Sequence, residues 1–162
     1  MFTTADAIGR ETIDIEERTE LVDLLNRYRM AGYEAYAPDP DFVSLDLLIQ
    51  ICASPSAFAG IVEAAVLSAL NPRDTAGRPG FFNPNNFTFG QPLERSQLEA
   101  AIQRVPGVGG ITCIEYRLRN RLGGLVEMPD SVAVGGNQII RCDNDRSLAE
   151  HGSIQIKVGG GR

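Results

Sequence analysis

The chain has 162 residues, of which 43% are hydrophobic and 22% are charged, a composition close to that of an average soluble globular domain. A domain of this length can bury enough surface to form a core without disulfide bonds or a bound metal. The net charge of −6 lacks the basic excess that contact with a phosphate backbone requires, so the composition argues against nucleic-acid binding.

Charge and glycine are both distributed unevenly along the chain. Residues 1–81 contain 13 acidic side chains, 6 basic side chains and 5 glycines, whereas residues 82–162 contain 8 acidic side chains, 9 basic side chains and 12 glycines. Because glycine permits tight reversals of the backbone, the second half is expected to consist of short elements joined by turns. The acidic first half is interpreted as a solvated surface.

Residues 1–13 show no periodicity and are interpreted as a flexible N-terminal lead, with a single α+β domain over 14–162. Asp14 and Glu17 have the spacing of a helix-capping pair, and Gly32 is a stop signal. Between them the apolar residues recur along one helical face, at Leu21, Leu24, Leu25 and Tyr28. A helix is therefore predicted here, followed by a short extended piece over 33–36.

The most regular strand pattern in the chain runs from Phe42 to Ala53. Odd-numbered positions 43–51 are all apolar, and even-numbered positions 44–52 carry a more polar set, so the two sets face opposite sides of a sheet. Ser54 and Pro55 then resemble an N-cap and a first-turn proline, which predicts a helix that ends near Asn71. A long connection over 72–92 is rich in proline and asparagine.

After this connection, Ser96 and Glu99 have the spacing of a capping box, and a helix is predicted to run to about Arg104. A strand is expected over 111–119, with Ile111, Cys113, Glu115 and Arg117 on one face. Residues 120–137 are interpreted as an irregular insertion or long hairpin, and two short strands are expected over 138–142 and 153–158. The order of elements predicts an α+β fold, with two or three helices packed on one face of a largely antiparallel, ferredoxin-like sheet.

Motifs for catalysis are missing from the sequence. The single histidine, His151, lies in a polar turn and is expected to be exposed to solvent, so it offers no base for a serine or cysteine nucleophile. Neither a nucleophile elbow nor a phosphate-binding loop is present. The sequence therefore predicts a protein that is not an enzyme, with no catalytic residues and no cofactor.

Metal binding and membrane insertion are not expected either. The three cysteines, Cys52, Cys113 and Cys142, lie far apart and are predicted to be free, buried thiols in a reducing compartment. Residues 143–150 resemble a calcium loop only superficially, and an Asx turn is favoured. The N-terminus lacks the pattern of a secretory signal, and the longest uncharged stretch, 47–62, is too short to span a bilayer.

The most unusual feature is an aromatic-rich segment in the long connection. Four of the seven phenylalanines fall within nine residues, between Arg78 and Gly90. So much aromatic area either packs onto the domain itself or binds a partner protein. Both alternatives remain open, and the interface hypothesis names five residues: Arg78, Phe81, Phe82, Phe87 and Phe89.

Six segments of the chain form a recognisable series: Tyr28–Gly32, Val43–Asp46, Arg78–Pro92, Val105–Val108, Asp143–Asp145 and Gly159–Gly160. They resemble, in the same order, the C-terminal part of baseplate J-like proteins, which are baseplate assembly proteins of contractile tails and injection systems. Together they span about residues 20–162, and Arg78–Pro92 is the most specific of them. Members of this family are usually much longer and have an N-terminal portion that has no counterpart here.

The resemblance implies a non-enzymatic structural component of a baseplate, acting as a wedge assembly module through protein–protein contacts. Its implied partners are other wedge subunits, the sheath initiator and the hub and spike proteins, with self-association in a ring. The implied location is the cytoplasm during assembly and afterwards a phage tail or injection particle. The alternative from the fold pattern alone is a small regulatory ligand-binding domain.

Overall fold

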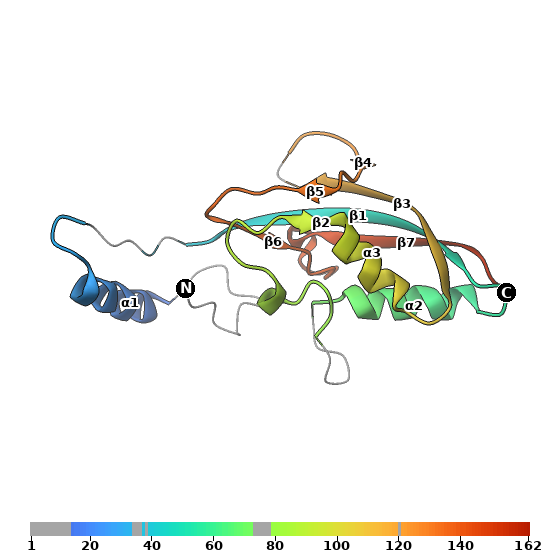
Figure 1. Ribbon diagram of the computed structural model, residues 1–162, viewed down its shortest axis with the longest axis horizontal. Helices are drawn as coiled ribbons and strands as arrows, with labels where there is room; N and C mark the ends of the chain where they lie inside the picture. The colour runs from blue at the N-terminus through green and yellow to red at the C-terminus, as the bar shows by residue number, and fades with distance from the viewer. Residues whose placement is uncertain (1–13, 34–36, 38, 73–78, 120) are drawn as a thin grey trace.

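The computed structural model describes residues 14–33, 37, 39–72, 79–119 and 121–162 (Figure 1). The predicted N-terminal lead and most of the predicted extended piece at 33–36 lie outside these residues. The described residues form three α-helices: α1 (Ile15–Tyr28), α2 (Ala59–Leu70) and α3 (Arg95–Gln103). In the same part of the chain the seven strands are β1 (Asp41–Ala53), β2 (Leu93–Glu94), β3 (Val108–Leu118), β4 (Val126–Glu127), β5 (Ser131–Val132), β6 (Gln138–Arg141) and β7 (Ser153–Gly160), and the 3-10 helices are η1 (Pro84–Asn86) and η2 (Ala149–His151).

Strand β1 is the centre of the main sheet. β3 pairs with one edge of β1 in antiparallel register, and β4 extends the sheet beyond β3. β6 and β7 both run parallel to β1, with β6 opposite 41–44 and β7 opposite 46–53. The predicted α+β class is therefore confirmed, in a sheet that is mixed rather than purely antiparallel, while the ferredoxin-like detail is not confirmed.

Helices α2 and α3 pack on one face of this sheet (Figure 1). The face is formed by the odd-numbered apolar residues of β1, as the alternation in the sequence predicts. These side chains form the core together with apolar residues of both helices: Leu45, Leu47, Ile49, Ile51, Val62, Val66, Leu70, Leu98 and Ile102. Burying each such side chain contributes roughly 1.5–3 kcal/mol, so this layer accounts for most of the stability of the domain.

Helix α1 forms where the sequence predicts it but does not join this core. None of its residues is buried, and Leu24, Leu25 and Tyr28 of the apolar face are exposed. Figure 1 shows the helix beyond one end of β1, away from α2 and α3. Two helices, rather than three, therefore cover the sheet.

The predicted caps of the other two helices are wrong. α2 begins four residues after Pro55, with Phe58 at its N-cap, because residues 54–57 form a separate turn in which the Ala57 backbone N–H donates to the Ser54 carbonyl. α3 begins at Arg95, one residue before the expected cap. Glu99 accepts a hydrogen bond from Arg95 Nε at 2.8 Å, an i,i+4 ion pair that takes the place of a capping box.

Strand β3 contains an irregularity that the alternation did not reveal. Ile111 pairs with Ile51 while Cys113 pairs with Gln50, so the register shifts between them. Such a bulge moves the preceding residue to the opposite face. Ile111 consequently packs against the core, and its predicted place on the same face as Cys113 and Glu115 is wrong.

The part of 120–137 that the structure describes is tied to the domain by strand pairings and by backbone hydrogen bonds. β4 pairs with β3, and β5 pairs with β2 in a separate two-stranded sheet. Between them, the Met128 backbone N–H donates to the Ile114 carbonyl at 2.8 Å, and its side chain is buried. In the described residues, no helix combines the length and hydropathy needed to cross a membrane.

Candidate functional site

The described part of the aromatic-rich segment, residues 79–92, folds against the C-terminal end of α2. The backbone N–H groups of Phe81 and Phe82 donate to the carbonyls of Ala69 and Leu70, at 2.9 and 3.2 Å. These carbonyls belong to the last turn of α2, where no further helical N–H is available. The segment therefore acts as a C-terminal cap. Gly80 permits this approach, since a Cβ there would lie 1.9 Å from the backbone oxygen of Asn71.

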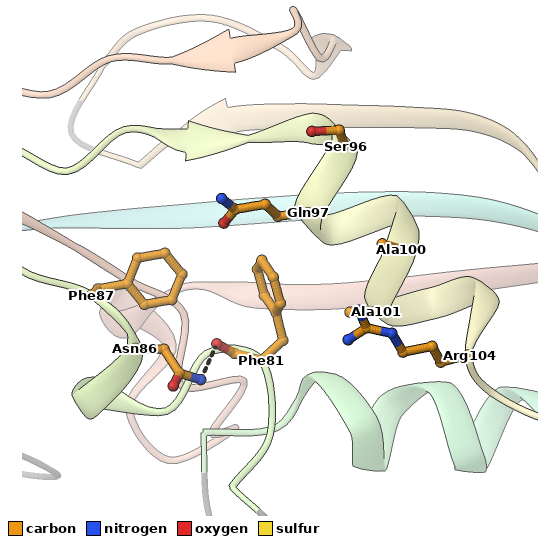
Figure 2. A pocket seen from close by; sticks show the side chains of 8 residues that line it. All are labelled: Phe81, Asn86, Phe87, Ser96, Gln97, Ala100, Ala101 and Arg104. Atoms are coloured by element: carbon orange, nitrogen blue, oxygen red, sulfur yellow. Dashed lines mark hydrogen bonds between the residues drawn. The ribbon is translucent and has the colours of Figure 1, made fainter.

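Asparagine side chains hold the shape of the segment. Asn83 donates through Nδ2 to the carbonyl of Pro72 at 2.8 Å, and its Oδ1 accepts from the backbone N–H of Asn85 at the start of η1. The amide of Asn86 donates to the carbonyls of Gly80 and Phe81, at 2.9 and 3.0 Å; the second bond is drawn in Figure 2. Asn83 and Asn86, for which the sequence predicted no role, therefore stabilise the fold of the segment.

Three of the four phenylalanines form one cluster. The rings of Phe82 and Phe87 are stacked, and the ring of Phe81 meets both edge-on with centroids 5.0 and 5.8 Å away. Phe82 and Phe87 are buried in the core, whereas Phe81 and Phe89 are half-buried.

This burial corrects the interface hypothesis in part. The core covers the ring of Phe82 and nearly all of the ring of Phe87, so self-packing, the other open alternative, describes most of the surface of these two residues. Phe87 also lines a surface hollow with the small part of its surface that stays uncovered. Phe81 and Phe89 keep part of their surface, and Arg78 lies outside the described residues.

Beside the cluster lies an open hollow, the α2–α3 groove. It consists of two adjoining depressions of about 400 and 590 Å³ that share Phe81, Asn86, Ala101 and Arg104. α3 supplies Gln97 and Ala100 to one of them, and α2 supplies Ala65 and Ala69 to the other. Figure 2 shows Phe81 and Phe87 of the aromatic segment on one side and α3, with Arg104 after its end, on the other.

The chemistry of the groove suits contact with another polypeptide. Its lining is formed by alanines, one proline-rich turn, phenylalanine rings and a few neutral polar groups. Among the described lining residues Arg104 alone is charged, and no acid–base pair is present. Small side chains on two neighbouring helices let another polypeptide approach the backbone closely, and the aromatic rim together with an arginine is typical of protein interfaces.

A second cluster, Cys142, Asp143 and His151, superficially resembles a catalytic arrangement. His151 is buried, so its predicted exposure is wrong, and its Nδ1 lies 2.8 Å from Oδ2 of Asp143. The thiol of Cys142, however, is also buried and donates to the Leu45 carbonyl at 3.4 Å. Burial and the charges of Asp143 and Asp46 raise the pKa of this thiol well above its ordinary value, which is the opposite of what a nucleophile needs.

The geometry of this loop explains why His151 is inside. The backbone N–H of Asp143 donates to the His151 carbonyl, and Oδ1 of Asn144 accepts from the backbone N–H of Ile154 at 2.9 Å. These bonds close the loop between β6 and β7 against β1. The predicted Asx turn is present, with the backbone N–H of Ser147 donating to Oδ1 of Asp145 at 2.8 Å.

All three cysteines are free, as predicted, but their burial differs. Cys142 is buried and Cys113 is half-buried. Cys52, near the C-terminal end of strand β1, is exposed, and its Sγ lies 3.5 Å from Oγ1 of Thr112. The prediction of burial is therefore wrong for Cys52. Within the residues described, no three histidine, cysteine or acidic side chains gather in a way that would hold a metal ion.

No model of a known protein family matches the chain, and no curated protein sequence matches it.

Proposed function

We propose that this protein is a non-enzymatic assembly module in the baseplate of a contractile tail or contractile injection system, and that it acts through contacts in the α2–α3 groove. Its partners are other wedge subunits, the sheath initiator and the hub and spike proteins, and copies of it associate in a ring. It is made and assembled in the cytoplasm and then forms part of the particle.

One observation carries this proposal. The segment that most resembles baseplate J-like proteins, Arg78–Pro92, contributes the wall of the α2–α3 groove through its described residues Pro79, Gly80, Phe81 and Asn86. Asparagine hydrogen bonds and two packed phenylalanine rings make this long loop rigid. The loop therefore holds the half-buried ring of Phe81 in a fixed position. Rigid presentation of an aromatic side chain lowers the entropic cost of binding.

The shape of the groove supports a polypeptide partner. It is a surface hollow rather than an enclosed cavity and is lined by small residues of two helices, so a helix or an extended segment of a neighbouring subunit fits better than an enclosed small molecule. Arg104 beside the hollow is positioned to pair with a carboxylate or carbonyl of that segment.

The test is reconstitution with purified wedge and sheath-initiator proteins of a contractile system. Wild-type protein should co-elute with at least one of them in size-exclusion chromatography. Ala101→Trp, which fills the groove, and Phe81→Ala, which removes its rim, should abolish or strongly weaken this association. Leu122→Ala, which truncates a fully exposed apolar side chain outside the groove, is the matched control and should bind normally.

Two results would count against the proposal. Normal assembly by folded Ala101→Trp protein would show that partners do not use the groove. A reproducible, concentration-dependent rise in Tm with an amino acid or nucleotide would favour the alternative of a small regulatory ligand-binding domain.

A further inference from the structure

The sheet face opposite α2 and α3 carries a cluster of arginines at one end. The even-numbered residues of β1 line this face, and their register partners lie beside them: Arg117 of β3 and Ser153 of β7 are opposite Asp46, and Arg141 of β6 is opposite Ser44. Residues directly opposite in a sheet point to the same face. Four strands therefore bring polar side chains together here.

At the centre of this cluster, the buried carboxylate of Asp46 fixes two guanidinium groups. Its Oδ2 accepts from Arg117 Nη2 at 2.5 Å, from Arg117 Nε at 3.2 Å and from Arg119 Nε at 3.1 Å. Its Oδ1 accepts from the Ser153 hydroxyl at 2.7 Å. Burial alone would raise the pKa of Asp46, but these hydrogen bonds outweigh it and hold the pKa below its ordinary value, so the carboxylate is charged at neutral pH.

The pairing leaves an excess of positive charge. One carboxylate neutralises one of the two guanidinium groups, and the side chains of Arg117 and Arg119 remain 39% and 31% exposed. Arg119 donates to Asp46 through Nε only, so within the described part of the chain its two terminal Nη groups have no hydrogen-bond acceptor. These Nη groups are held in position by the bond at Nε, and they face solvent.

A third guanidinium extends the cluster toward β6. Nη2 of Arg141 lies 3.5 Å from the Ser44 hydroxyl, and its guanidinium lies over the Phe42 ring, 4.6 Å from the centroid. The backbone N–H of Arg119 donates to the carbonyl of the same Ser44. Arg141 and Arg119 therefore approach one residue from two sides.

We propose that Arg117 and Arg119, beside the positive charge of Arg141, form a binding surface for carboxylate side chains of an acidic protein segment. A guanidinium fork matches a carboxylate in two parallel hydrogen bonds, and the prior contact with Asp46 reduces the entropy lost on binding. The occupant is a protein segment, because the positive charges are spread over β3 and β6, on opposite edges of β1, an arrangement that suits several carboxylates along one polypeptide. This inference does not depend on the proposed baseplate function.

A nucleic acid is the less suitable polyanion. The chain carries a net charge of −6, and Glu115 lies on the same face, two residues from Arg117. A phosphate backbone would meet these charges along its length, whereas one or two carboxylates on a protein surface can avoid them. The surface therefore favours a few localised negative charges.

The experiment measures fluorescence anisotropy of a labelled oligoglutamate peptide titrated with the full chain at low ionic strength. Wild-type protein should bind it, should not bind an oligoglutamine peptide of equal length, and should lose affinity as NaCl is added. Arg119→Gln should weaken binding about tenfold, the effect of one lost charge-assisted pair. Arg119→Lys keeps the charge but not the forked pair of donors, so its affinity for the peptide should lie between those of wild type and Arg119→Gln.

Arg27→Gln on α1 removes the same charge from an exposed site and is the matched control, which should bind like wild type. Circular dichroism melting shows whether each variant is folded, and Arg119→Lys provides the comparison if Arg119→Gln is not. If Arg27→Gln and Arg119→Gln weakened peptide binding equally, the effect would come from the net charge of the protein alone, and the proposal would be overturned. Tighter binding of a single-stranded oligonucleotide than of oligoglutamate would also overturn it.

Discussion

The rings of Phe82 and Phe87 are stacked with centroids 5.8 Å apart and an interplanar angle of 12°. Both belong to a loop whose backbone caps α2, and both are buried in the core. The pair therefore joins a connection of the chain to the layer that stabilises it. Phe81, next to Phe82 in sequence, shares the cluster but keeps part of its ring at the surface.

This difference predicts separate effects of two neighbouring substitutions. Phe82→Ala should lower the free energy of unfolding by about 3–5 kcal/mol, since it empties a buried site. Phe81→Ala should cost roughly half of that or less, because water already reaches part of the ring. Urea denaturation followed by circular dichroism measures both. Equal losses would mean that Phe81 is as much a core residue as Phe82.

Asp46 should make stability depend on acid pH. Its pKa is below the ordinary value in the folded protein, so the stabilisation is fully present above the unfolded-state pKa of about 3.9 and is lost as the pH falls through the lower folded value. Asp46→Asn should lower the unfolding free energy at pH 7 by about 2 kcal/mol and should flatten its dependence on acid. Denaturation at several pH values tests this, and an unchanged acid dependence in the variant would contradict it.

Gly152 should not tolerate a side chain. Its φ is 95°, and a Cβ there would lie 2.3 Å from the carbonyl oxygen of Leu45. Gly152→Ala should therefore destabilise the protein by about 2 kcal/mol or more, through backbone strain and displacement of the loop that holds His151. Thermal unfolding measures the effect.

Gly60 provides the matched control for this substitution. It lies in the first turn of α2, and a Cβ there would have nothing within 4 Å. Gly60→Ala should leave stability unchanged or raise it by up to about 1 kcal/mol, because alanine favours the helix. Similar losses at Gly60 and Gly152 would contradict the contact with Leu45.

Leucines of the first and third helices should differ in their effect on stability. Leu98 of α3 is fully buried, and Leu98→Ala should cost about 2–5 kcal/mol. Leu24 of α1 is 45% exposed, and Leu24→Ala should change the unfolding free energy by no more than about 0.5 kcal/mol. Urea titration of both variants decides this. A large loss for Leu24→Ala would mean that α1 packs on the domain in solution.

The elements that the sequence predicted best are those in which local pattern and burial agree. The alternation over 42–53 predicted both the strand and its core face, because the apolar side chains from Leu45 to Ile51 belong to the same buried cluster as residues of α2 and α3. Helix α1 shows the limit of this reasoning. Its periodicity predicted a helix correctly, but periodicity says nothing about whether a partner is present for the apolar face.

The candidate sites were less accessible to the sequence. The aromatic segment stood out by composition, yet which rings are inside depends on its contact with the last turn of α2. The cluster around Asp46 gave no signal at all, since Asp46, Arg117 and Ser153 lie far apart in the chain. Only the strand register, with β3 and β7 on opposite edges of β1, places them together.

The α+β class, the positions of the main helices and strands, and the apolar face of β1 could be predicted from local pattern, because they depend on periodicities within a few residues. The fold was needed to show that α1 is unpacked, that His151 is buried, and that the groove and the arginine cluster lie on opposite faces of the sheet. Burial and the meeting of distant charges follow from long-range pairing, which local sequence does not encode.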